Sequence, residues 1–65
     1  MKNKYNLWKK DHSGNPIEGT DVLVEADTLR LAIRWIANRE GLKWKQGATS
    51  VKTPDGGGWY GQKIN

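Results

Sequence analysis

The feature that most constrains the fold is one amphipathic segment in the middle of the chain, TLRLAIRWIANREG (residues 28–41). Its apolar residues recur at helical spacing and form a single stripe, made of Leu29, Ala32, Ile33, Ile36 and Ala37. Asp27 occupies the expected N-cap position, and Gly41 suits a left-handed C-terminal stop. The pattern predicts a helix of about 13 residues. Because so short a helix is marginal in isolation, it needs a surface to pack on.

The residues before this helix have the pattern of a β-hairpin. KYNLWKK (residues 4–10) alternates as a strand does, which places Trp8 on the face opposite Leu7. TDVLVEA (residues 20–26) is rich in residues that favour strands. The run DHSGNP (residues 11–16) between them is dense in turn formers, so we expect two strands joined by a long loop.

A second hairpin is predicted after the helix. ATSVKT (residues 48–53) and WYGQKI (residues 59–64) read as the third and fourth strands. Residues 54–56, Pro-Asp-Gly, have the chemistry of a reversing turn. The element order β-β-α-β-β favours the α+β class, with an antiparallel β-sheet and one helix packed on one face. We expect one small domain over residues 1–65.

Chain length and composition limit how such a fold is stabilised. Sixty-five residues lie near the lower limit for an unaided hydrophobic core, and no cysteine is present to form a disulfide or a thiolate metal site. The one histidine, His12, leaves too few ligands for zinc. We therefore predict no metal and no cofactor. The four tryptophans or a second subunit are expected to supply the missing stabilisation.

Charge and hydropathy limit the partners and the compartment. Lys and Arg number 11 against 7 Asp and Glu, and the net charge of +4 favours an anionic partner such as nucleic acid or an acidic protein surface. No apolar run approaches the ~20 residues of a membrane span. The basic start of the chain also lacks the apolar core of a secretory signal. We expect a cytoplasmic protein with no membrane partner.

Two motifs that resemble phosphate-binding or catalytic sites are better explained as turns. The glycines of PDGGGW (residues 54–59) precede a strand-like run, whereas a phosphate-binding loop leads into a helix. In DHS (residues 11–13) the side chains are adjacent and diverge, whereas a catalytic triad needs side chains that converge from separate segments. We therefore predict no catalytic residues and no enzyme activity.

The helix carries two apolar residues, Leu31 and Trp35, that lie off the apolar stripe and one turn apart. One interpretation is that a small core wraps round and buries Trp35 at the sheet edge. A second is a contact surface, because an aromatic anchor beside arginines is typical of an interface hot spot. A homodimer is the third. The predicted partner-binding surface is the outward helix face, made of Arg30, Arg34, Trp35, Asn38 and Arg39.

An alternative function is a small basic domain that binds DNA or RNA directly. Trp8 faces away from Leu7, and either Trp59 or Tyr60 must also face away from the helix. Together with nearby lysines, these rings would form a stacking surface for single-stranded bases. The opposing interpretation is that the tryptophans merely cover a bare sheet face. The residues of this alternative set are Trp8, Lys9, Lys10, Lys43, Lys45, Trp59, Tyr60 and Lys63.

Two longer segments carry a resemblance to a known family. EGTDVLVEADTLRLAIRWIANREG (residues 18–41) followed by VKTPDGGGWYGQK (residues 51–63) resembles the small phage-encoded anti-CRISPR proteins that bind the type I-F surveillance complex. In one of them, a similar EGT, a strand, a helix that ends in Ile-Ala-polar-basic-Glu, and a strand pair around a glycine turn and Trp follow in the same order. The resemblance covers about residues 18–63.

The resemblance implies a non-enzymatic phage or mobile-element inhibitor that binds a host nucleoprotein defence complex in the host cytoplasm. Such proteins contact the crRNA-bearing subunits through a basic and polar helix face, touch nucleic acid there, and block hybridisation of target DNA. By position, Arg34 and Arg39 match basic helix residues of that relative. Trp35 stands in place of a basic residue, and Gly41 in place of a polar contact residue. The net charge of +4 excludes the mechanism of acidic anti-CRISPR proteins that mimic DNA.

Overall fold

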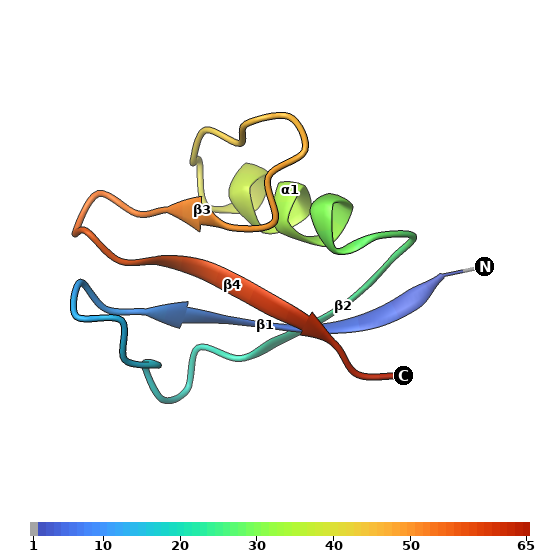
Figure 1. Ribbon diagram of the computed structural model, residues 1–65, viewed down its shortest axis with the longest axis horizontal. Coiled ribbons are helices and arrows are strands. Elements are labelled where there is room, and N and C mark those ends of the chain that lie inside the picture. The colour runs from blue at the N-terminus through green and yellow to red at the C-terminus, as the bar shows by residue number, and fades with distance from the viewer. Residues whose placement is uncertain (1) are drawn as a thin grey trace.

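A computed structural model describes residues 2–65 as one helix packed on one face of a four-stranded antiparallel sheet (Figure 1). The elements in chain order are β1 (Asn3–Lys10), β2 (Val22–Ala26), α1 (Leu29–Arg39), β3 (Val51–Lys52) and β4 (Gly58–Lys63). This arrangement confirms the predicted α+β class and the order β-β-α-β-β. No helix in residues 2–65 combines the length and the apolar character needed to cross a membrane.

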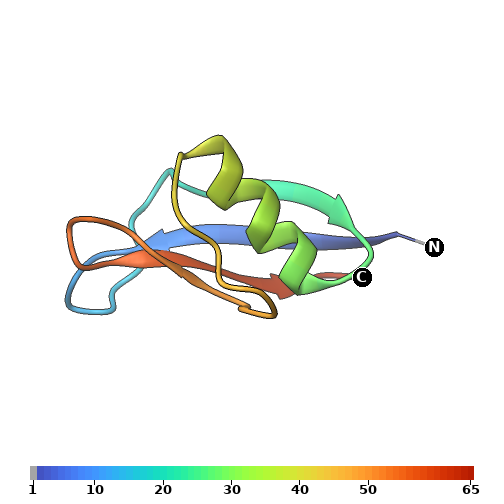
Figure 2. The same ribbon diagram turned by 90° about the horizontal axis from the view of Figure 1, so that it is seen from above.

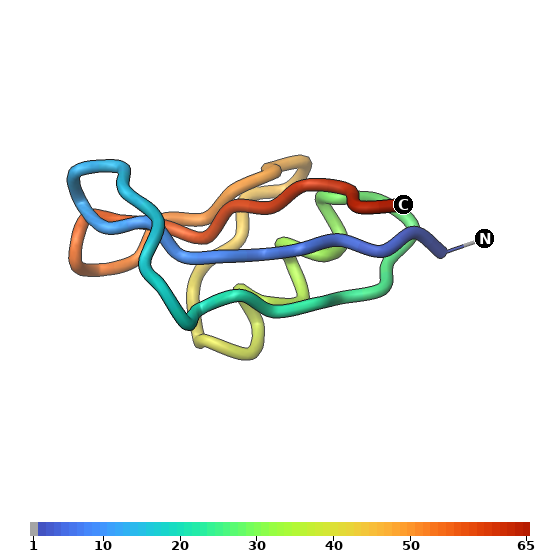
Figure 3. The backbone as a smooth tube through the Cα atoms, turned by 90° about the horizontal axis from the view of Figure 1, so that it is seen from below, coloured from blue at the N-terminus to red at the C-terminus, as the bar shows by residue number. Residues whose placement is uncertain are grey.

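The strand order across the sheet is β2-β1-β4-β3, so the first and last strands of the chain lie side by side at its centre. Figure 3 shows β1 running between β2 and β4. In register, Leu7 lies between Val22 of β2 and Gly61 of β4. Trp8 lies opposite Tyr60. Each half of the chain therefore supplies one hairpin, and β1 joins the two hairpins.

The alternation of strand residues gives the sheet one apolar face, which α1 covers. Tyr5, Leu7 and Trp59 point toward the helix and are buried, whereas Trp8 and Tyr60 point to the other face. The predicted helix stripe packs onto this apolar face. The core therefore consists of Tyr5, Leu7, Ala32, Ile33, Ile36, Ala37, Val51 and Trp59.

Thr28 is the N-cap of α1, and the expectation that Asp27 caps the helix is wrong. Thr28 has an extended backbone, and its hydroxyl accepts a hydrogen bond of 3.2 Å from the Leu31 N–H. Asp27 lies one residue too early, because the first helical residue is Leu29. The helix has 11 residues rather than about 13. Either residue type is a good cap, so composition alone did not distinguish them.

Gly41 ends the helix as predicted. Its φ of 70° lies in the left-handed region that favours glycine. The N–H of Leu42 donates to the carbonyl of Ala37 at 2.8 Å, and the N–H of Gly41 donates to that of Asn38 at 3.3 Å. This pair of hydrogen bonds is the Schellman arrangement, which satisfies the last helical carbonyls and turns the chain back toward the sheet.

The segment that follows α1 forms a loop, which extends into the range predicted for the third strand. The predicted strand at residues 48–53 is reduced to β3, Val51–Lys52. Within this loop, the indole N–H of Trp44 donates to the Ala48 carbonyl at 3.0 Å. The Ala48 N–H also donates to the Lys45 carbonyl at 2.9 Å, which closes a local turn. Figure 2 shows the loop returning alongside α1 before it enters β3.

Both predicted turns are present. In the second hairpin, the Gly56 N–H donates to the Thr53 carbonyl at 3.1 Å, and Gly56 has a φ of 92°. In the first loop, the Asp11 carboxylate accepts hydrogen bonds from the N–H groups of Ser13 and Asn15 at 2.9 and 3.0 Å. The DHS run is thus a polar turn.

Candidate functional site

The outward face of α1 carries two exposed apolar side chains. Trp35 is 46% exposed and Leu31 is 42% exposed. They lie one helical turn apart, and the helix buries its opposite stripe against the sheet. The interpretation that Trp35 is buried at the sheet edge is therefore wrong, and the contact surface and the homodimer stay predictions. The helix leaves this apolar pair uncovered because the sheet is reached only by the opposite side of α1.

The charged and polar residues predicted around Trp35 are also exposed. Arg30, Arg34, Asn38 and Arg39 are spread over the outward half of the helix, with Arg30 and Arg39 at its two margins. The Arg39 guanidinium lies 5.2 Å from the centre of the Trp35 ring, a cation–π distance. Its Nε also contacts Glu40 Oε2 at 3.2 Å in an exposed ion pair, which adds little stability.

The other two arginines of this face carry uncompensated charge. The only ion pair among residues 2–65 joins Arg39 and Glu40. Arg30 and Arg34 therefore have no carboxylate partner. An arginine without an internal partner keeps its N–H donors available for an external carboxylate or phosphate. The outward helix face therefore combines two apolar anchors with free guanidinium groups.

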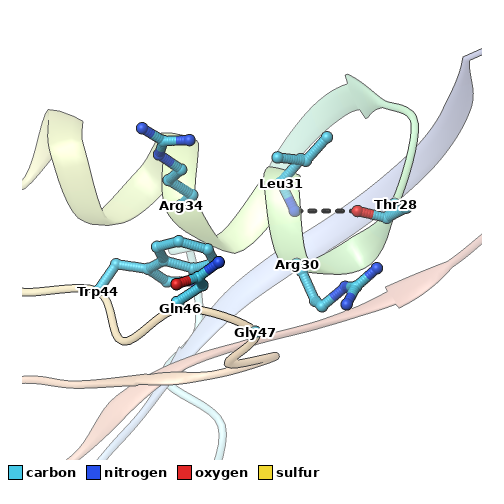
Figure 4. Close-up of a pocket in the computed structure, with 7 residues that line it drawn as sticks. All are labelled: Thr28, Arg30, Leu31, Arg34, Trp44, Gln46 and Gly47. Carbon is cyan, nitrogen blue, oxygen red and sulfur yellow. Dashed lines mark hydrogen bonds between the residues drawn. The ribbon is translucent and has the colours of Figure 1, made fainter.

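A groove of about 560 Å³ runs between α1 and the loop that follows it (Figure 4). Arg30, Leu31 and Arg34 form its helical wall, and Trp44 forms the opposite wall. The structure thus divides the predicted surface into two parts. Arg30 and Arg34 border the groove, whereas Trp35 and its neighbours on the far side do not line it. The lining residues are Thr28, Arg30, Leu31, Arg34, Trp44, Gln46 and Gly47.

Trp44 is the aromatic member of this groove that the sequence analysis missed, and Thr28, Gln46 and Gly47 were not predicted as site residues either. The hydrogen bond from its indole N–H to the Ala48 carbonyl fixes the ring, and the Arg34 guanidinium lies 5.5 Å from the ring centre. A guanidinium over an aromatic face is held in place while the edges of its plane stay free to donate. The sequence feature that could have pointed to Trp44 is its position between two lysines, KWK, in an otherwise polar connection.

The structure separates the residues of the alternative nucleic-acid set. Trp8, Lys10 and Tyr60 share the uncovered face of the sheet. Lys9 and Lys63 lie on the face of the sheet that α1 covers. Trp59, which is 3% exposed, belongs to the core. Lys43 and Lys45 lie on the loop after α1. The eight residues therefore do not form one continuous surface.

The ionisable groups of the two turns have structural explanations. The hydroxyl of Thr53 and the N–H of Gly57 both donate to the Asp55 carboxylate, and these hydrogen bonds lower the pKa of Asp55. Asp55 is therefore an organiser of the β3–β4 turn. Across residues 2–65, no three His, Asp or Glu side chains gather closely enough to hold a metal ion.

Comparison of the chain with models of protein families, with curated proteins and with solved structures found no match.

Proposed function

We propose that the protein is a non-enzymatic binding protein that docks onto a host nucleoprotein through the helix face, defined as Arg30, Leu31, Arg34, Trp35, Asn38 and Arg39. The observation that carries the proposal is the pairing of exposed Leu31 and Trp35 with arginines that lack an internal partner. Apolar side chains held outward on a small domain cost solubility, and large exposed apolar patches mark interaction sites.

The chemistry of the helix face fits a protein partner with acidic groups or bound phosphates. Tryptophan and arginine are the residues most enriched at interface hot spots, where truncation of one such side chain costs about 2 kcal/mol or more. Trp35 would enter an apolar pocket of the partner, while Arg30 and Arg34 would pair with carboxylates or phosphates around it. The net charge of +4 would speed the encounter with an anionic surface.

The resemblance to anti-CRISPR proteins supplies a specific partner for this surface. We propose that the host nucleoprotein is a type I-F CRISPR surveillance complex, and that the bound protein blocks access of target DNA. Stoichiometric binding needs no catalytic residues, which agrees with the absence of a catalytic motif in the sequence. An exposed helix with a cationic and aromatic surface is the element of this chain best suited to such docking.

The test is binding of the purified protein to an immobilised type I-F surveillance complex. The wild type should bind, and it should prevent the complex from shifting labelled target DNA in a native gel. The double variant R34A/W35A should lose both activities while its circular dichroism spectrum stays that of the folded protein, since both side chains are exposed.

A matched control removes one cation and one exposed apolar side chain from the opposite side of the sheet. Lys4 and Leu23 are both exposed there, and Leu23 is 73% exposed. The variant K4A/L23A should bind as the wild type does. Wild-type protein that fails to bind the complex would refute this partner, and R34A/W35A that binds at full strength would refute the helix face.

A further inference from the structure

The face of the sheet opposite α1 is covered by no other element of residues 2–65. Figure 3, seen from below, shows the central strands in front of the helix, with only the loop between β1 and β2 crossing them near one end. In most two-layer domains such a face is polar, because it meets only water. Here its centre carries two aromatic rings, Trp8 and Tyr60, which lie opposite each other on neighbouring strands.

Around Trp8 and Tyr60, the register of the strands sorts this face into three rows. Trp8 and Tyr60 form an aromatic row, and Lys10 and Lys52, which both pair with Gly58, form a cationic row beside it. An amide row lies on the other side. Successive rows are two residues apart along each strand, a spacing of about 7 Å. We call this surface the sheet platform, and it consists of Asn6, Trp8, Lys10, Lys52, Tyr60 and Gln62.

Gly58 gives the Tyr60 ring its position on this surface. A Cβ atom at Gly58 would lie 3.3 Å from Tyr60 Cε2 and 2.8 Å from the carbonyl oxygen of Val51. The missing side chain therefore lets the ring lie close to the backbone of β4. The Lys10 ammonium lies over the ring, 4.5 Å from its centre, so a base that stacks on Tyr60 must displace this flexible side chain from the ring face.

Trp8 borders a shallow hollow of about 420 Å³ on the same face. Pro16 and Asp21 form the far side of the hollow, and Asn6, Lys10 and Gln62 complete it. The two aromatic rings are only partly buried, in contrast to the core residues on the helix side. The platform is thus an open surface with a depression beside its largest ring.

The charges of this face are unevenly placed. The acidic residues on it lie toward β2, where Asp21 accepts a hydrogen bond of 3.1 Å from the Asn6 amide and Glu25 stands opposite Lys4. Neither Lys10 nor Lys52 has a carboxylate within ion-pair distance among the described residues. The positive charge that remains for an external anion is therefore concentrated in the cationic row, Lys10 of β1 and Lys52 of β3, two residues along the strands from the aromatic row.

We propose that the sheet platform binds single-stranded nucleic acid. Two bases stack on Trp8 and Tyr60, the backbone phosphates follow Lys10 and Lys52, and the Gln62 amide is placed to meet a base edge. Stacking on aromatic side chains combined with a cationic track is how sequence-tolerant single-strand binding works. A duplex is excluded as the occupant because its bases are stacked on each other and cannot present a free face to the rings.

The platform is independent of the helix face, since α1 and the sheet lie between them. Its composition also differs from that of the helix face, which has isolated apolar anchors among arginines. On the platform the aromatic rings adjoin lysines and amides, a composition that suits bases and phosphates better than a buried protein surface. This assignment keeps Trp8, Lys10 and Tyr60 of the sequence-derived set and adds Lys52 with the two amides.

The test measures fluorescence anisotropy of labelled oligo(dT) and oligo(U) of about 12 nucleotides at about 50 mM salt. Both should bind, with log K falling against log salt at a slope of about −1.4 if two phosphates are neutralised. W8A should weaken binding about 5- to 150-fold, as expected for loss of one stacked base. Comparison of the two oligonucleotides shows which sugar the site accepts.

Matched charge variants keep the test decisive even if W8A folds poorly. K10Q/K52Q removes two charges from the platform, and K43Q/K45Q removes two from the loop on the helix side. The first pair should weaken binding at least tenfold more than the second. Equal effects of the two lysine pairs, wild-type binding by a folded W8A, or no binding of either oligonucleotide would overturn the proposal.

Discussion

Replacing Gly61 by alanine probes how closely the helix and the sheet approach each other. Gly61 lies on β4 directly opposite Leu7, on the face that α1 covers. An added Cβ would collide with Leu7 Cδ2 and would lie 3.1 Å from Leu29 Cδ1 and from the Asn6 carbonyl oxygen. Ordinary contacts between carbon atoms are about 3.5–4.0 Å. Leu7 is fully buried, so its methyl group has no free space to move into.

The expected loss of stability follows from two opposing terms. Overpacking a core by one methyl group costs about 1–3 kcal/mol. The loss of glycine's freedom in the unfolded chain returns about 0.4–1 kcal/mol. The net loss should be about 1–2 kcal/mol, which lowers the melting temperature of a domain of this size by about 4–16 °C. Thermal unfolding followed by far-ultraviolet circular dichroism measures this change.

Two further variants make the G61A measurement specific. Gln62 is the exposed neighbour of Gly61 on the opposite face, so Q62A should change stability by less than about 0.5 kcal/mol. L7V removes the methyl group that the new Cβ would meet, so the double variant L7V/G61A should lose less than the two single variants added together. A melting temperature of G61A at or above that of the wild type, or strict additivity in the double variant, would refute the reasoning.

Three other predictions concern the caps and the β3–β4 turn. T28A should lose about 1 kcal/mol of unfolding free energy in urea, and D27A clearly less, because Thr28 is the N-cap; an equal loss in both would contradict the capping geometry. G41A should lose about 1–2 kcal/mol, because its φ is positive, and an unchanged urea midpoint would contradict this. Because its pKa is lowered in the folded protein, Asp55 adds stability at pH values above its ordinary pKa of 3.8. This stability is lost as the pH falls through the lower pKa of the folded state. Below about pH 4, the melting temperature of D55N should therefore depend less on pH than that of the wild type. Parallel curves of melting temperature against pH would contradict the assignment.

The sequence was sufficient for the elements whose periodicity is strong. The helical stripe and the alternation of residues 4–10 predicted α1, β1 and the face of Trp8. The off-stripe position of Trp35 marked it as unusual but left its burial or exposure open, and the structure shows it exposed. These predictions held because each depends on the local repeat of one element. The prediction of Asp27 as the N-cap was wrong because the local sequence does not decide it. Asp27 and Thr28 are both good caps, and the path of the chain out of β2 selects Thr28.

The features that the sequence did not predict depend on contacts between elements. The groove beside α1 exists because Trp44 is held by the Ala48 carbonyl and lies under Arg34, and no local pattern specifies that contact. The choice between Trp59 and Tyr60 for the core depends on how β4 is placed against β1. The alternation in β1 already indicated that the alternative nucleic-acid set could not lie on one face, because adjacent Lys9 and Lys10 must point to opposite faces.

The central position of β1 also determines when the protein can fold. During synthesis the β1–β2 hairpin and α1 emerge early, but one edge of β1 has no partner until residues 58–63 have been made. Contacts between residues so distant in sequence slow folding, because the loop between them must close first. Until then the apolar side of β1, including Tyr5 and Leu7, stays incompletely covered. Nascent chains that stall before β4 are therefore expected to be targets for proteases and chaperones.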